Sequence, residues 1–173
     1  GVPAWALRVE VEFLSISGDG TDQWGVQVGN TATGFATTGY AGSVSGGTST
    51  LAFSNGFTAM QSTATAAVWN GRIVLSRARA ADTTWIYTGW MGRSDSAAIV
   101  HLGAGRVTIT DLDRVRIAML GGSSAFDGSG SIRAKAGGSA RWRWAQCAIW
   151  KSRSHRAICW PRSNGFFHKL RPT

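Results

Sequence analysis

The sequence predicts an all-β protein, an antiparallel β-sandwich with jelly-roll-like connectivity. Seven or eight short segments alternate apolar and polar residues with a period of two, the pattern of a strand buried on one face. Clusters of Gly, Ser, Asp and Asn separate these segments, and 23 of the 173 residues are Gly, which suits many tight turns. Helical periodicity is not convincing anywhere along the chain.

Two strands are expected near the N-terminus. Residues 6–16, ALRVEVEFLSI, alternate apolar and charged residues. The inward-facing residues are Leu7, Val9, Val11 and Phe13. A turn over 17–22, SGDGTD, leads to a second strand at 23–29. The same turn faintly resembles a calcium-binding loop, but it lacks the later Glu, so glycine-mediated turning explains it better.

In the middle of the chain, the sequence predicts a loop followed by a hairpin. Residues 30–50 are polar and Gly-rich, which indicates mainly loop with a short strand near Tyr40. The strongest hairpin pattern follows, with strands at 63–69 and 72–79 joined by Asn-Gly at 70–71. Asn-Gly favours the type I′ turn that connects antiparallel strands.

Four further strands are expected toward residue 136. They cover 83–93, 96–104, 113–120 and 130–136. In the third, the core-facing residues are Val115, Ile117 and Met119, while Arg114 and Arg116 face solvent. The fourth is expected to return beside it as the second arm of a hairpin.

The net charge of +9 is concentrated at the C-terminus. Residues 141–173 hold eight of the eighteen basic residues and no acid, so residues 1–140 carry a net charge of only +1. We therefore expect a sandwich domain over 1–140 and a basic, Trp-rich extension over 141–173. No run of about 18 apolar residues occurs, so no membrane span is expected.

Groups able to do chemistry are few. Neither the three His nor the two Cys show metal-ligand spacing, and no Ser lies in a nucleophile-elbow pattern. Asp111 and Asp113 would suit a glycosidase, but a solvated strand start is the preferred interpretation. We predict no catalytic residue, no metal and no cofactor, and expect that Asp111, Asp113 and His101 do not share a cleft.

Four tryptophans could form a sugar-stacking platform, because indole rings complement the apolar faces of pyranoses. They are Trp24, Trp69, Trp85 and Trp90. In strands, Trp is more often part of the core or of an interface between protomers, and that interpretation is preferred.

An ordered set of segments carries a resemblance to a known family. They are PAWALRVEVEFLSISGDGTDQWGVQVG, TTGY, NGF, VWNGRIVLS, TTWIYTGW and LDRVRIAMLGGSSAFDGSGSI. Together, over roughly residues 2–135, they resemble a recurrent module of tailed-bacteriophage and prophage proteins. The module is similar to the C-terminal parts of tail fibres and other virion surface proteins.

The resemblance implies a virion structural protein, not an enzyme, on the surface of a phage particle. A tail-fibre or receptor-binding module is preferred, and a capsid decoration (cement) or head-fibre protein is the alternative. Other virion proteins, a homotrimer and host surface carbohydrate are the implied partners. The resemblance also implies that Phe126 is a buried plug, with Asp127 and Gly128 shaping the turn after it. A carbohydrate-active enzyme and a nucleic-acid-binding protein are more remote alternatives.

The extension at 141–173 departs from the family. Its proposed interface residues are Arg141, Trp142, Arg143, Trp144, Trp150 and Trp160. Docking on the body or on a neighbouring protein, contact with nucleic acid, and a shifted reading frame would all produce this composition. Docking is preferred, because each large ring that is buried stabilises by roughly 1.5–3 kcal/mol. Deleting 141–173 is then expected to weaken assembly with modest salt dependence, and pairing of Cys147 with Cys159 stays open.

Overall fold

The protein is a β-sandwich of two antiparallel sheets that pack face to face. The computed structural model describes residues 1–46, 49–60, 67–94, 100–122, 124–126 and 130–138, with the backbone of 142–147 and 157–158. Within these ranges the regular structure is all strand, which confirms the predicted fold class. The described residues contain no helix long and apolar enough to cross a membrane. The jelly-roll connectivity stays a prediction.

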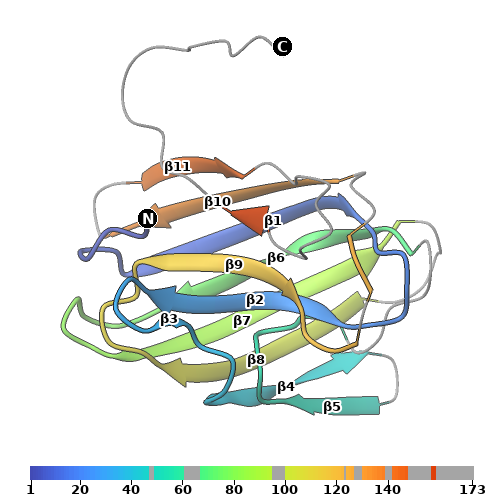
Figure 1. The fold of residues 1–173 in the computed structure, drawn as a ribbon, viewed down its shortest axis with the longest axis horizontal. Helices are drawn as coiled ribbons and strands as arrows, with labels where there is room; N and C mark the ends of the chain where they lie inside the picture. The colour runs from blue at the N-terminus through green and yellow to red at the C-terminus, as the bar shows by residue number, and fades with distance from the viewer. Residues whose placement is uncertain are drawn as a thin grey trace, which may run out of the picture.

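The larger sheet has eight strands and the smaller has four (Figure 1). From edge to edge, the larger sheet contains β11 (Trp142–Cys147), β10 (Ser131–Gly137), β1 (Arg8–Ile16), β6 (Trp69–Ser76), β7 (Thr84–Arg93), β8 (Val100–Thr108), β4 (Tyr40–Gly46) and β5 (Ser49–Phe53). The smaller contains β12 (Ala157–Ile158), β9 (Arg114–Met119), β2 (Trp24–Asn30) and β3 (Gly34–Phe35).

The core fills the space between the sheets. Its largest members are Trp24, Trp69, Trp85, Tyr87 and Phe57, each no more than 2% exposed. The five residues predicted to be buried, Val9, Val11, Phe13, Val115 and Ile117, all belong to this core. Arg114 and Arg116 lie on the other side of β9, with their guanidinium groups 5.9 and 4.4 Å from the Phe35 ring. The predicted alternation in both strands is confirmed.

β1 contains a bulge that changes which residues face the core. Phe13 pairs with Gly71 and Ile16 pairs with Trp69, so two residues of β1 lie opposite Asn70 alone. Such an insertion shifts the alternation by one residue, which explains why Ile16 is buried while Leu14 is exposed. Ser15 adopts a φ of 55° in the bulge, and its N–H donates to Asn70 Oδ1 at 2.8 Å.

The predicted turn at Asn70-Gly71 is wrong, because both residues lie inside β6. Asn70 is needed there to bind the bulge of β1. Gly71 is needed because a Cβ would overlap the Trp90 carbonyl oxygen of β7. The connection to β7 lies instead at 77–83, where Arg79 and Asp82 form a turn closed by a 3.0 Å backbone hydrogen bond. Residues 61–66, in the first predicted arm, are outside the described residues.

The prediction of mainly loop over 30–50 is also wrong. β3, β4 and the first two residues of β5 fall in this region. The short strand expected near Tyr40 is confirmed as β4. Its apolar pattern is weak because Gly42 takes a core position in β4, where a Cβ would overlap the Phe53 ring and the Ala104 carbonyl oxygen. The Phe53 ring of β5 thus fills the core position at which Gly42 has no side chain.

Residues 113–136 do not form a hairpin, which corrects a further prediction. β9 belongs to the smaller sheet and β10 to the larger one, so the segment between them crosses from one layer to the other. Its described part packs on the 18–22 turn, since the Asp22 and Asp19 carboxylates accept the N–H groups of Ser124 and Ala125 at 2.7 and 2.6 Å. Phe126 is half-buried, 5.9 Å from Trp24 between ring centroids, while Asp127 and Gly128 are outside the described residues.

The backbone of the extension contributes one strand to each sheet. β11 pairs with β10 from Ile132↔Cys147 to Gly137↔Trp142, and β12 pairs with β9 at Ile117 and Arg116. Both of these partners belong to the same chain. The β11 and β12 side chains are outside what the structure describes.

Both tyrosines of the chain hydrogen-bond in the core. The Tyr40 hydroxyl accepts the Val28 N–H at 2.9 Å and donates to the Ala36 carbonyl at 3.1 Å, which connects β4 to β2. The Tyr87 hydroxyl donates to the Thr58 carbonyl. Burial raises the pKa of Tyr40 to about 12 and raises the pKa of Tyr87 further. Neither group should ionise in the folded protein near pH 10.

We expect the folded protein to lose stability as the pH rises from about 10 to about 12. Unfolded tyrosine ionises near pH 10, whereas folded Tyr40 stays neutral to about 12, so deprotonation favours the unfolded chain in this window. Tyrosinate absorbance measures it directly, because the chain has only these two tyrosines. Native protein at pH 10.5 should show little tyrosinate and urea-unfolded protein much more. Equal absorbance in the two states would contradict the buried placement.

Candidate functional site: the outer face of the eight-stranded sheet

The face of the larger sheet that points away from the core carries exposed apolar side chains. The described residues include seven exposed large hydrophobic residues, and five of them lie on this face. They are Leu14, Ile86, Trp90, Val100 and Leu102. Trp90 pairs with Leu102 and Gly92 with Val100, so the apolar side chains of β7 and β8 adjoin. Because exposed apolar side chains gather on it, this face is the candidate for a binding surface.

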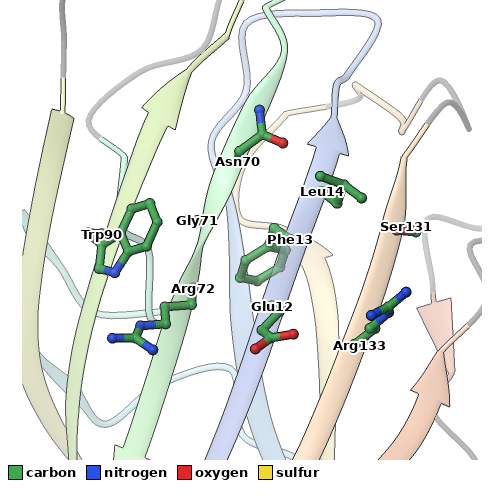
Figure 2. A pocket seen from close by; sticks show the side chains of 9 residues that line it. All are labelled: Glu12, Phe13, Leu14, Asn70, Gly71, Arg72, Trp90, Ser131 and Arg133. Carbon is green, nitrogen blue, oxygen red and sulfur yellow. The ribbon is translucent and has the colours of Figure 1, made fainter.

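A pocket of about 380 Å³ opens on this face across β10, β1, β6 and β7. Its lining residues are Glu12, Phe13, Leu14, Asn70, Gly71, Arg72, Trp90, Ser131 and Arg133. Figure 2 shows Trp90 and Arg72 on one side of it, and Leu14 and Arg133 on the other. Its volume lies in the range of small-ligand sites, and it combines an aromatic wall with a few polar groups.

The pocket depends on the bulge and on Gly71. Leu14 lies on the outer face because it follows the core-facing Phe13 in the regular alternation of β1. The bulge fixes Asn70, whose Oδ1 accepts the hydrogen bond from the Ser15 N–H. Gly71 contributes only backbone atoms to the pocket lining. A side chain at residue 71 would lie on the core side of β6 and would overlap β7. Trp90 is 42% exposed on β7, directly opposite Arg72 of β6 in the register.

Charged groups on β1, β6 and β10 form a connected set beside the pocket. Glu10 is 2% exposed, and its carboxylate lies 3.3 Å from Arg8, 3.2 Å from Arg72 and 3.5 Å from Lys135. Lys135 also lies 3.6 Å from Glu12. A carboxylate removed from water requires such partners. The set therefore holds Arg72 in place at the pocket rim.

The four tryptophans considered for sugar stacking have different positions. Trp24, Trp69 and Trp85 are at most 2% exposed, which confirms the preferred core interpretation for them. Trp90 is the exception, since it lines the pocket. The sequence reasoning missed the other pocket residues, among them Glu12, Arg72 and Arg133. The one feature of the sequence that points to these residues is their outward position in alternating strands.

The sequence-predicted polar candidates lie apart. His101 is near the start of β8, 5.2 Å from the Trp69 ring, whereas Asp111 and Asp113 follow the end of β8. Burial, and then the charge of Arg93, lowers the pKa of His101. Desolvation acts to raise the pKa of Asp113, but hydrogen bonds from Arg114 and Thr31 outweigh it and the pKa is lowered. These contacts give Asp113 a structural role at the entry to β9.

The interface candidates of the extension are outside the described side chains. They are Arg141, Trp142, Arg143, Trp144, Trp150 and Trp160. Three of them, Trp142, Arg143 and Trp144, lie in β11, where the structure describes the backbone alone. In the described ranges, no cluster of three His, Cys, Asp or Glu side chains could hold a metal ion.

The fold and the pocket define an all-β sandwich with a ligand-sized depression on one open sheet face. Comparisons with protein-family models, with curated proteins and with solved structures gave no match. The pocket lining offers an exposed indole face for apolar groups, and guanidinium, carboxylate, amide and hydroxyl groups for polar ones.

Proposed function

We propose that this chain is a surface-attachment module of a tailed-bacteriophage particle, of the tail-fibre or receptor-binding class, and that it binds host surface carbohydrate. The observation that carries the carbohydrate part is the half-exposed Trp90 beside a polar pocket on the outer sheet face. Sugars present both apolar ring faces and hydroxyl groups, and such a pocket complements both.

Placement on a phage particle rests on the sequence resemblance over residues 2–135. A capsid decoration or head-fibre protein is the alternative within the same class, and a homotrimer is the proposed assembly. Antibody labelling of intact particles, observed by electron microscopy, distinguishes these positions. Label at the tail tip supports the proposal, whereas label spread over the head favours a decoration protein.

The proposed role is binding without catalysis. Glycoside hydrolysis uses two carboxyl groups about 5–9.5 Å apart on either side of the bond. Glu12 is the carboxylate among the described lining residues, and Lys135 lies 3.6 Å from it. Glu10 is buried beneath three cations, so it is poorly placed to exchange a proton with a ligand.

A bacterial-glycan array tests the carbohydrate part. We expect the protein to bind a subset of glycans, and Trp90→Ala to weaken this by at least about tenfold, since tryptophan hot spots contribute about 2 kcal/mol or more. Trp5→Ala is the matched control, because Trp5 is 41% exposed but does not line the pocket. Equal losses in the two variants, or no loss in Trp90→Ala, would contradict a site at Trp90.

A further inference from the structure

Four pocket residues lie side by side in one row across the strands. Arg133 of β10 pairs with Glu12 of β1, Glu12 pairs with Arg72 of β6, and Arg72 pairs with Trp90 of β7. Neighbouring strands are about 4.8 Å apart, so the row from Arg133 to Trp90 spans roughly 14 Å. That span exceeds one pyranose ring. A ligand that contacts both ends must therefore be an oligomer.

Arg133 differs from the other cations near the pocket. It is exposed, and among the described side chains it makes no ion pair or hydrogen bond. Arg72 is instead held by Glu10, and Lys135 lies between Glu10 and Glu12. A guanidinium presents paired N–H groups that match a carboxylate in a bidentate geometry. Arg133 thus offers an open anion-binding group at the end of the row away from Trp90.

The surrounding charge also favours an anion. Four cations, Arg8, Arg72, Arg133 and Lys135, adjoin two carboxylates, Glu10 and Glu12, which gives this part of the sheet a net charge of +2. Residues 1–140 as a whole carry only +1. Glu12, the carboxylate in the pocket lining, is partly neutralised by Lys135 at 3.6 Å.

We propose that the ligand is an acidic oligosaccharide that lies across the strands, with one sugar ring on Trp90 and the carboxylate of another on Arg133. This rests on the proposed carbohydrate binding and adds the ligand's charge, its direction and its minimum length. The carboxylate gains a charge-assisted hydrogen bond at Arg133 that a neutral sugar cannot make.

The experiment compares tetragalacturonate with its methyl ester, which has the same rings without the charge. We expect titration calorimetry to show at least about tenfold tighter binding of the acid form, as for one hydrogen bond to a charged group. Arg133→Gln should reduce the affinity for the acid form to that for the ester. Arg106→Gln is the matched control, because Arg106 is exposed on the same face, on β8, outside the pocket.

The outcomes separate this inference from the proposed function. Equal binding of acid and ester by the native protein, or equal losses in Arg133→Gln and Arg106→Gln, would overturn the acidic ligand. The proposed function would still stand if Trp90→Ala weakened both forms. No binding of either tetramer by the native protein would also overturn the inference, and the glycan array would then decide the proposed function by itself.

Discussion

Replacing Trp85 with alanine is expected to lower the free energy of unfolding by about 3–5 kcal/mol, the usual cost of truncating a buried tryptophan. Trp85 is 0% exposed in β7, and the Arg77 guanidinium lies 4.7 Å from its ring. Arg77 also donates to the Ala6 carbonyl at 2.9 Å, so it connects the β6–β7 turn to the chain before β1. The truncation would leave a cavity beneath this connection.

Trp90→Ala is the matched control for this loss, because Trp90 lies on the same strand but faces outward at 42% exposure. We expect it to change the free energy of unfolding by less than about 1 kcal/mol, as is usual for surface positions. Urea unfolding followed by circular dichroism measures both variants. A similar loss in both would contradict the assignment of the two tryptophans to opposite faces of β7.

The opposite positions of Trp85 and Trp90 could have been predicted from the sequence. They are five residues apart in a strand with a period of two, so they must face opposite sides. The same periodicity correctly predicted the buried residues of β1 and β9. Strand pairing could not be predicted in this way, because it depends on contacts between segments far apart in the chain. The pocket combines β1, β6, β7 and β10, and no local pattern joins them.

Asn70-Gly71 shows why a strong local pattern can mislead. The dipeptide favours a type I′ turn when nothing else acts on it. Here Asn70 binds the bulge of β1 and Gly71 allows the close approach of β7, so both residue types are required for reasons outside β6. Contacts with β1 and β7 therefore decide that Asn70 and Gly71 lie in a strand and not in a turn. The same bulge turns Ile16 into the core, whereas the outward position of Leu14 follows from the regular alternation after Phe13.

Gly71→Ala is expected to affect stability and binding together. A Cβ at this position would overlap the Trp90 carbonyl oxygen and lie 2.7 Å from the Met91 sulfur, so β7 must move away from β6. Overpacking of this kind costs about 1–3 kcal/mol. Because the displaced backbone carries Trp90, glycan affinity should fall in the same variant, although residue 71 brings no side chain of its own to the pocket.

Gly92→Ala provides the comparison, since a Cβ at Gly92 meets no atom within 4 Å and lies on the same strand as Trp90. Urea unfolding and glycan binding are measured on both variants. We expect Gly92→Ala to match the native protein in each, because it relieves no strain and creates no overlap. If Gly71→Ala also matched the native protein, β6 and β7 would not be in the close contact described. If it lost stability but kept its glycan affinity, the ligand would not depend on the position of Trp90, and the site would have to lie elsewhere on the sheet.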